Sequence, residues 1–353
     1  MVTLLFYGVS GSGKSFTAKL EITAIMLKDK NSDIIIIDPE AEYKPLERDL
    51  GGEVIKISAQ SDNHINALDL NKNYGEKNPI IEKAEFVLSL CEQAMGGKDI
   101  TSMQKSIIDR CTSLVYRYYE QGNYKGTPPT LEDFRKVLLE QPETEAKEIA
   151  LALELFTTGS LNTFSKQTNV EVNNRLICYD IKDLGEQLTP LGMLVILDSI
   201  LNRISKNREK GKTTYIFIDE IYLLFKYEYT SRFIFELWKR IRKYGGCATG
   251  ITQNVEELLI NKKARMMLAN SELIIMLNQS ATDRNELASL LNMKEMETKY
   301  ITNVGTGEGL IKVKSSLVPF ENKFPKDTKL YKLMTTKLEE TIDYANNKGE
   351  EKI

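Results

Sequence analysis

Short apolar stretches alternate with helical patterns along most of the 353-residue chain. Runs of strand-forming residues lie at positions 2–7, 33–37, 54–57, 175–180, 214–218, 247–252, 273–277 and 310–313. Apolar residues recur with helical spacing at 15–26, 191–205 and 231–243. At 34–37 and 215–218 the apolar residues are continuous, which is typical of strands buried on both faces of a sheet. The pattern predicts an α/β fold with a mostly parallel central sheet flanked by helices.

A different pattern occupies the stretch from 75 to 156. Four helical segments follow one another at 80–95, 102–120, 131–140 and 144–156, separated by joints rich in Gly, Pro and Asn. We interpret 75–156 as an all-helical insertion into a domain formed by residues 1–74 and 157–325. The charged residues 326–353 predict a C-terminal helical tail.

Composition excludes several classes of function. The 47 Lys and Arg residues against 50 Asp and Glu leave a net charge of -3, so contact with nucleic acid or anionic lipid must be local. The single histidine, His64, lies in a polar segment that predicts a loop, and the four cysteines are far apart. This argues against a zinc cluster or a disulfide framework and for a reducing compartment. Because no apolar run reaches the ~18–20 residues of a membrane span, we expect any membrane contact to be peripheral.

Eight residues between the first predicted strand and the first predicted helix fit the phosphate-binding pattern G-x-x-x-x-G-K-[ST]. The candidate nucleotide-binding residues, which include the next position, are Gly8, Ser10, Gly11, Ser12, Gly13, Lys14, Ser15 and Phe16. Glycines let the backbone N–H groups approach a phosphate, Lys14 would neutralise the β- and γ-phosphates, and Ser15 would bind Mg²⁺. The alternative is a glycine turn that caps an ordinary helix. We predict that the chain binds ATP and Mg²⁺ here.

Two adjacent carboxylates, Asp219 and Glu220, end the predicted strand at 214–218. Asp219 would hold Mg²⁺ through water, and Glu220 would polarise the water that attacks the γ-phosphate. Taken alone, a buried strand that ends in acids is common, because acids are favoured near helix N-termini. Combined with the glycine-rich loop, the second acid points to a hydrolytic motor ATPase of the RecA-like type.

Four further residues are candidates for catalysis, each with a simpler alternative. Gln253 follows a predicted strand and would contact the γ-phosphate or its water, or else it begins a loop. Arg242 would reach the nucleotide of a neighbouring subunit, or it is a solvated cation at a helix end. Arg284 is a second candidate for that role, with a surface ion pair as the alternative. Glu40, after a strand, would orient water or metal, unless Asp38-Pro39-Glu40 is only a turn with solvated acids.

Together these segments resemble the HerA–FtsK branch of RecA-like ATPases. The segments that carry the resemblance are 8–15, Asp38-Pro39-Glu40, Ile65-Asn66-Ala67-Leu68-Asp69, Asp219-Glu220 and 242–246 leading to Thr252-Gln253. Arg242 precedes Gln253 by 253 − 242 = 11 positions, the register in which that superfamily places an arginine before its Thr-Gln pair. Segments 155–160, 175–184 and 307–311 are similar to the VirB-four (TraC/TraE) class of type IV secretion ATPases. The resemblance extends from Leu5 to about Pro319.

This resemblance implies an ATPase that energises assembly of a conjugative transfer channel and substrate passage through it. It further implies a hexamer or other ring that works with other type IV secretion components in the cytoplasm, at the cytoplasmic face of the inner membrane. Such proteins carry a helical insertion between sheet strands and usually a large N-terminal domain. Because Met1 lies a few residues before the glycine-rich loop, the resemblance implies the C-terminal ATPase part of a longer protein.

Two other functions stay open from the sequence. The first is a HerA/FtsK-like DNA translocase or coupling protein, for which the acidic net charge is mildly unfavourable. The second is a nucleotide-binding scaffold with little hydrolysis, which Glu220 and Gln253 disfavour. A small-molecule kinase is the least favoured function, because the sequence shows no signature of a separate acceptor site.

Overall fold

The structure is a computed structural model, and it describes residues 4–75, 78–97 and 100–336. Within this part, the strands form one nine-stranded sheet in the order β3-β4-β2-β5-β6-β1-β7-β8-β9. The strands are β1 (Leu4–Tyr7), β2 (Ser32–Asp38), β3 (Glu53–Lys56), β4 (Leu176–Asp180), β5 (Thr213–Ile218), β6 (Gly246–Thr252), β7 (Leu273–Met276), β8 (Glu308–Val313) and β9 (Ser316–Glu321). Strands β1 to β7 pair in parallel, whereas β8 and β9 add an antiparallel edge. The predicted α/β fold with a mostly parallel sheet is confirmed.

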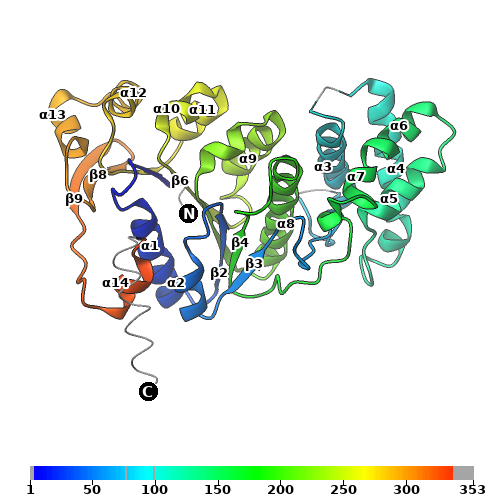
Figure 1. Ribbon diagram of the computed structural model, residues 1–353, viewed down its shortest axis with the longest axis horizontal. Coiled ribbons are helices and arrows are strands. Elements are labelled where there is room, and N and C mark those ends of the chain that lie inside the picture. The colour runs from blue at the N-terminus through cyan, green and yellow to red at the C-terminus, as the bar shows by residue number, and fades with distance from the viewer. Residues whose placement is uncertain (1–3, 76–77, 98–99, 337–353) are drawn as a thin grey trace, which may run out of the picture.

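Helices cover both faces of the sheet (Figure 1). One face carries α1 (Lys14–Lys28), α2 (Lys44–Asp49) and α14 (Lys329–Met334), and the other carries α8 (Thr189–Glu209), α9 (Glu228–Arg240), α10 (Val255–Ile260) and α11 (Lys262–Ala269). The remaining short helices of the sheet region are α12 (Ala281–Leu291), α13 (Glu295–Thr298), η1 (Asn162–Phe164), η2 (Ile221–Phe225) and η3 (Lys299–Ile301). In β2, Ile34 and Ile36 pack on the first face, and Ile35 and Ile37 pack on the second. This explains why the β2 sequence is apolar at successive positions.

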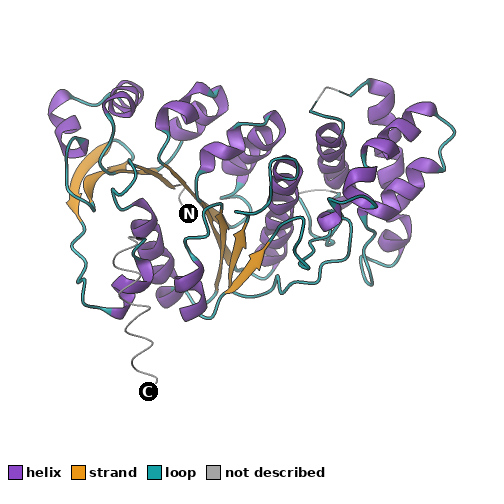
Figure 2. Ribbon diagram, in the orientation of Figure 1, coloured by secondary structure: helices purple, strands orange, loops and turns teal. Residues whose placement is uncertain are grey.

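In the described part of the chain, five α-helices stand between β3 and β4 and lie together at one end of the molecule (Figure 2). They are α3 (Pro79–Ala94), α4 (Ser102–Gln121), α5 (Leu131–Leu139), α6 (Thr144–Ala152) and α7 (Glu154–Thr157). Asn78 caps α3, and Thr101 and Thr130 form capping boxes at the starts of α4 and α5. We call α3–α7 the helical segment. It corresponds to the stretch predicted as helical, while the domain boundaries at 74/75 and 156/157 stay a prediction.

A buried ion pair joins the helical segment to α8. Lys83 of α3 is fully buried, and its Nζ donates to the carbonyl of Asp69 at 3.0 Å and to the carboxylate of Asp198 in α8. The hydroxyl of Tyr74 donates to the other oxygen of that carboxylate. Because removal of one partner leaves the other charge buried without compensation, this pair makes the junction sensitive to single substitutions.

We expect Lys83→Met to lower the free energy of unfolding by about 3 kcal/mol, because Asp198 loses its cation inside the protein. Urea denaturation followed by circular dichroism measures this loss. Lys136→Met is the control, since Lys136 pairs with Glu132 at 3.0 Å with both side chains exposed, and its loss should cost well under 1 kcal/mol. An equal, small effect of both substitutions would contradict the prediction.

Glu47 of α2 is fully buried, and burial raises its pKa from an ordinary value of 4.5 to about 8. A carboxyl group whose pKa is higher in the folded state binds more protons when folded, so its ionisation costs stability as pH rises from about 4.5 to about 8. We therefore expect Glu47→Gln to stabilise the protein by about 2 kcal/mol near pH 8.5 and much less near pH 5. Urea denaturation at both pH values, with the exposed Glu148→Gln as control, measures the difference. An equal effect of Glu47→Gln at both pH values would contradict it.

The structure corrects several expectations. Strand β9 was not predicted, because it is an exposed edge strand that contains Pro319 and pairs only with β8. The helix expected at 231–243 begins at Glu228 and ends at Arg240, and the one expected at 144–156 divides into α6 and α7. Residues 2–3 of the first predicted strand and 337–353 of the predicted tail lie outside the described residues. In the described ranges, no helix combines the length and apolar character needed to cross a bilayer.

Candidate functional site

The glycine-rich loop joins the end of β1 to the start of α1. Gly11 and Gly13 have φ values of 74° and 101°, a left-handed conformation that favours glycine. At Gly8, a Cβ atom would come within 2.4 Å of the Ser12 hydroxyl oxygen. These positions therefore depend on glycine for the shape of the loop. The loop is fixed by a hydrogen bond from the Val9 N–H to the Asn278 carbonyl at 2.9 Å.

This loop forms one wall of a pocket of about 670 Å³ at the carboxyl edge of the parallel strands. The predicted residues that line it are Ser10, Gly11, Gly13, Lys14, Ser15, Phe16, Glu40, Asp219, Glu220 and Gln253. They come together because β1, β2, β5 and β6 run in parallel and their carboxyl ends share one edge. Gly8 and Ser12 shape the loop without lining the pocket.

Lys14 presents its ammonium group inside the loop. Its side chain is buried, and Nζ donates to the Val9 carbonyl at 3.0 Å. Burial lowers its pKa, while the neighbouring carboxylates of Glu220, Asp219 and Glu42 act in the opposite direction. This buried cation faces an acidic wall.

The acidic wall begins with Asp219 and Glu220, directly after β5. Burial and the adjacent Glu220 raise the pKa of Asp219 to about 7. Glu220 has a left-handed backbone (φ 46°, ψ 50°), and its N–H donates to Oδ1 of Asp219 at 3.0 Å. Burial also raises the pKa of Glu220, whereas the Gln253 backbone N–H and Lys14 lower it. In the described part of the chain, Oε2 of Glu220 is buried without a hydrogen-bond partner, so it is available to a ligand or a water molecule.

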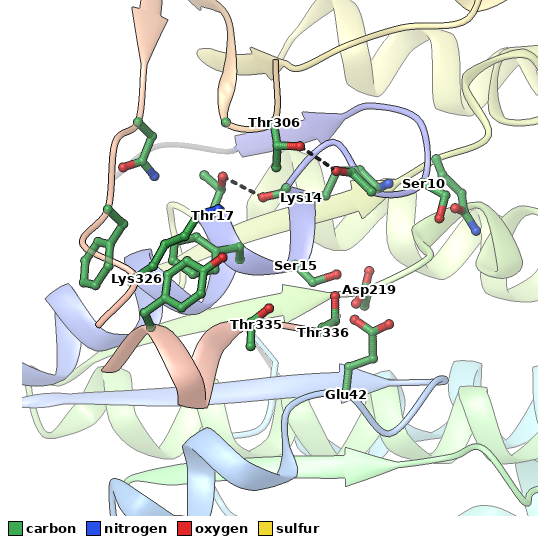
Figure 3. Close-up of a pocket in the computed structure, with 18 of the residues that line it drawn as sticks. Ser10, Lys14, Ser15, Thr17, Glu42, Asp219, Thr306, Lys326, Thr335 and Thr336 are labelled. Carbon is green, nitrogen blue, oxygen red and sulfur yellow. Dashed lines mark hydrogen bonds between the residues drawn. The ribbon is translucent and has the colours of Figure 1, made fainter. Parts of the chain in front are cut away.

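Ser15, Asp219 and Glu42 point toward a common space beside the loop (Figure 3). Hydroxyl and carboxylate oxygens are the ligand type that Mg²⁺ prefers. The residues present therefore fit a magnesium ion held by Ser15 and Asp219. Bound there, the ion would neutralise negative charge on the phosphate oxygens.

Glu42 was missed by the sequence reasoning, which singled out Glu40. The buried carboxylate of Asp38 accepts hydrogen bonds from the N–H groups of Glu40 at 3.3 Å, Glu42 at 3.2 Å and Tyr43 at 3.1 Å. These bonds fold the segment after β2 so that both glutamates line the pocket. A signal was present, because Glu42 follows the same strand end two positions later.

Residues far along the chain complete the pocket, and no local pattern indicated them. The Thr306 hydroxyl donates to the Gly11 carbonyl at 3.2 Å (Figure 3), and the Gly307 N–H donates to the Ser12 carbonyl at 3.0 Å. The Phe16 ring lies 5.6 Å from Phe324 and 5.3 Å from Tyr331, measured between centroids. The turn before β8 thus contacts the loop, and three aromatic rings also line the pocket.

The two candidate arginines lie outside this pocket. Arg242 precedes β6, at the amino edge of the sheet, where 73% of its side chain is exposed and it pairs with Glu272 at 3.2 Å. Arg284 of α12 donates to the Thr302 hydroxyl at 3.3 Å. Among the described residues that line the pocket, none is an arginine. His64 lies in a loop, as expected, with Nδ1 3.3 Å from the Thr163 carbonyl.

The family follows from a match over nearly the whole sequence. The model of the TraG P-loop domain matches residues 2–352. The chain belongs to the TraG P-loop domain family. This confirms the recognition of a conjugation-type P-loop protein from the sequence. No curated protein sequence matches this TraG P-loop chain.

Solved structures share its fold. VirB4 of Thermoanaerobacter pseudethanolicus has a TM-score of 0.77 at 23% identity, with 92% of this chain and 89% of that chain covered. The bacterial conjugative coupling protein TrwBdeltaN70, in its unbound form, has a TM-score of 0.57 at 15% identity, with 93% and 86% covered. TrwB in complex with the GTP analogue GDPNP has a TM-score of 0.51 at 15% identity, with 93% and 88% covered. The TraG P-loop chain therefore has the RecA-like P-loop fold.

Proposed function

We propose that this TraG P-loop chain hydrolyses Mg-ATP as a motor that energises assembly of, and substrate transfer through, a bacterial conjugation or type IV secretion apparatus. One observation carries the proposal: Lys14 and Ser15 of the loop and the acids Asp219 and Glu220 of β5 line one pocket, although about two hundred positions separate them. The family match and the VirB4-like fold support the biological setting.

Each residue has a distinct role in this proposal. The loop N–H groups and Lys14 hold the β- and γ-phosphates, and Ser15 and Asp219 hold the magnesium ion. Glu220 accepts a proton from the attacking water through its unpartnered carboxylate oxygen, and Gln253 and Glu40 orient that water. Phe16, with Phe324 and Tyr331, provides apolar ring surface for the base of ATP.

The experiment that tests the proposal measures phosphate release by purified protein as a function of its oligomeric state, with and without DNA. Magnesium-dependent release of phosphate from ATP supports the motor. ATP binding without turnover would favour the nucleotide-binding scaffold. Turnover that requires DNA, with a strong dependence on salt, would favour the coupling-protein or translocase alternative.

We further propose that the active form is a ring, a hexamer or another closed oligomer, with an arginine supplied by the neighbouring copy. The support is that the described pocket contains no arginine, whereas Arg242 and Arg284 stand on the surface or near it. Docking through other secretion components would hold the ring at the cytoplasmic face of the inner membrane.

We expect Arg242→Ala to lower turnover per subunit by about a thousandfold at a protein concentration where rings form, because an arginine stabilises the charge of the transition state. Phosphate release, measured across protein concentrations on species sized by light scattering, checks this. Arg240→Ala is the matched control, since Arg240 is a neighbouring exposed arginine that pairs with Glu236. If Arg242→Ala retains full activity and Arg284→Ala loses it, the second arginine has the role. Concentration-independent turnover by verified monomers would count against both.

A further inference from the structure

A second pocket, of about 410 Å³, lies between α8 and the helical segment. Its floor is the face of β2 and β4, formed by Ile35, Ile177 and Tyr179, and the Tyr124 ring lies at one wall. None of its lining residues belongs to the pocket beside the glycine-rich loop. The volume lies within the range of about 300–1,000 Å³ that is typical of small-molecule sites.

The rim of this second pocket is strongly cationic. Its charged residues are five cations, Lys72, Lys125, Arg203, Lys206 and Lys210, against two carboxylates, Asp69 and Glu209. Two of the cations already have acidic partners: Arg203 pairs with Asp33, and Lys72 lies 3.7 Å from Glu209. The other three, Lys125, Lys206 and Lys210, form no ion pair with a carboxylate within the described ranges.

Lys206 and Lys210 are one helical turn apart, at the end of α8. Within the described ranges, the Lys206 ammonium donates to a neutral group, the side-chain oxygen of Asn173, at 3.3 Å. Partial burial and the nearby charges of Lys210 and Arg203 lower the pKa of Lys206, whereas the nearby carboxylate of Glu171 acts in the opposite direction. Like charges gathered at one site repel one another, which costs free energy, and a bound anion offsets that repulsion.

We propose that this pocket binds a phosphate-bearing ligand of mononucleotide size. The ammonium groups of Lys206 and Lys210 hold the phosphate, and Lys125, which lines the same pocket, adds positive charge. The flat part of the ligand lies against the partly exposed side chains of Tyr124 and Val172, and side-chain amides such as Asn123 face its polar edge. Because the pocket lies between β2, β4, α8 and the helical segment, a bound ligand contacts all of them.

Isothermal titration of the full chain with AMP, GMP, CMP and UMP tests this assignment. The glycine-rich loop is first filled with magnesium and a non-hydrolysable ATP analogue, so that monophosphates have access only to the second pocket. A parallel titration in a Lys14→Ala background gives the same test without any nucleotide at the loop, and separates this proposal from the ATPase proposal. We expect saturable 1:1 binding of at least one monophosphate, weakened by added salt.

The double variant Lys206→Ala/Lys210→Ala should bind that monophosphate at least about tenfold more weakly. The matched control is Lys147→Ala/Lys299→Ala, which also removes two exposed positive charges but from helices away from the pocket. Unchanged melting temperatures show that both variants are folded. No binding of any monophosphate, equal affinity in the double variant and the wild-type chain, or binding only of oligonucleotides would overturn the proposal.

Discussion

Replacing Lys14 with alanine is expected to reduce ATP turnover by about a thousandfold and to weaken ATP binding as well. The ammonium group is buried inside the loop at hydrogen-bond distance from the Val9 carbonyl, where it would also meet the β- and γ-phosphates. A buried charge aimed at developing negative charge contributes about 10²–10³-fold or more to the rate, because water does not screen it. Phosphate release and titration with a fluorescent ATP analogue measure the two effects.

Lys28→Ala is the control for that substitution. Lys28 ends the same helix, α1, and its side chain is exposed, so both turnover and ATP affinity should stay at the wild-type level. If Lys14→Ala keeps wild-type turnover, the glycine-rich loop is not part of the catalytic site, and the proposed function is wrong.

The second large effect is expected for Glu220→Gln, which should bind Mg-ATP normally and hydrolyse it about 10²–10⁴-fold more slowly. Glutamine keeps the size of the side chain and an oxygen atom, but it accepts no proton from the attacking water. Single-turnover hydrolysis, measured together with ATP affinity, separates the chemical step from binding.

Glu257→Gln is its matched control, because this exposed glutamate lies just beyond Gln253 and outside the pocket, so neither quantity should change. A parallel loss of ATP affinity and turnover in Glu220→Gln would assign Glu220 to binding or folding. The two substitutions thus distinguish two roles. Lys14→Ala tests which residue holds the phosphates, and Glu220→Gln tests which residue activates the water.

The fold was predictable because its signals are local. The glycine-rich loop is continuous in sequence, and its position between an apolar strand and an amphipathic helix is visible without a structure. The apolar run in β2 reflects burial on both faces, which alone indicates a covered parallel sheet. Asp38 ends its strand, and Asp219 and Gln253 directly follow theirs, and parallel strands bring such positions to one edge. The exposed strand β9 has no such signal.

By itself, the sequence determined the parallel strands, the loop and the strand-end acids, since each depends on residues near one another in the chain. Only the tertiary structure placed Thr306, Phe324 and Tyr331 at the same pocket as Phe16, and Arg242 at the far edge of the sheet. It alone brought Lys125 and Lys206 to one pocket. Such contacts join segments about eighty to three hundred positions apart, and they are set by how helices pack across the sheet, which leaves no periodic trace in the sequence.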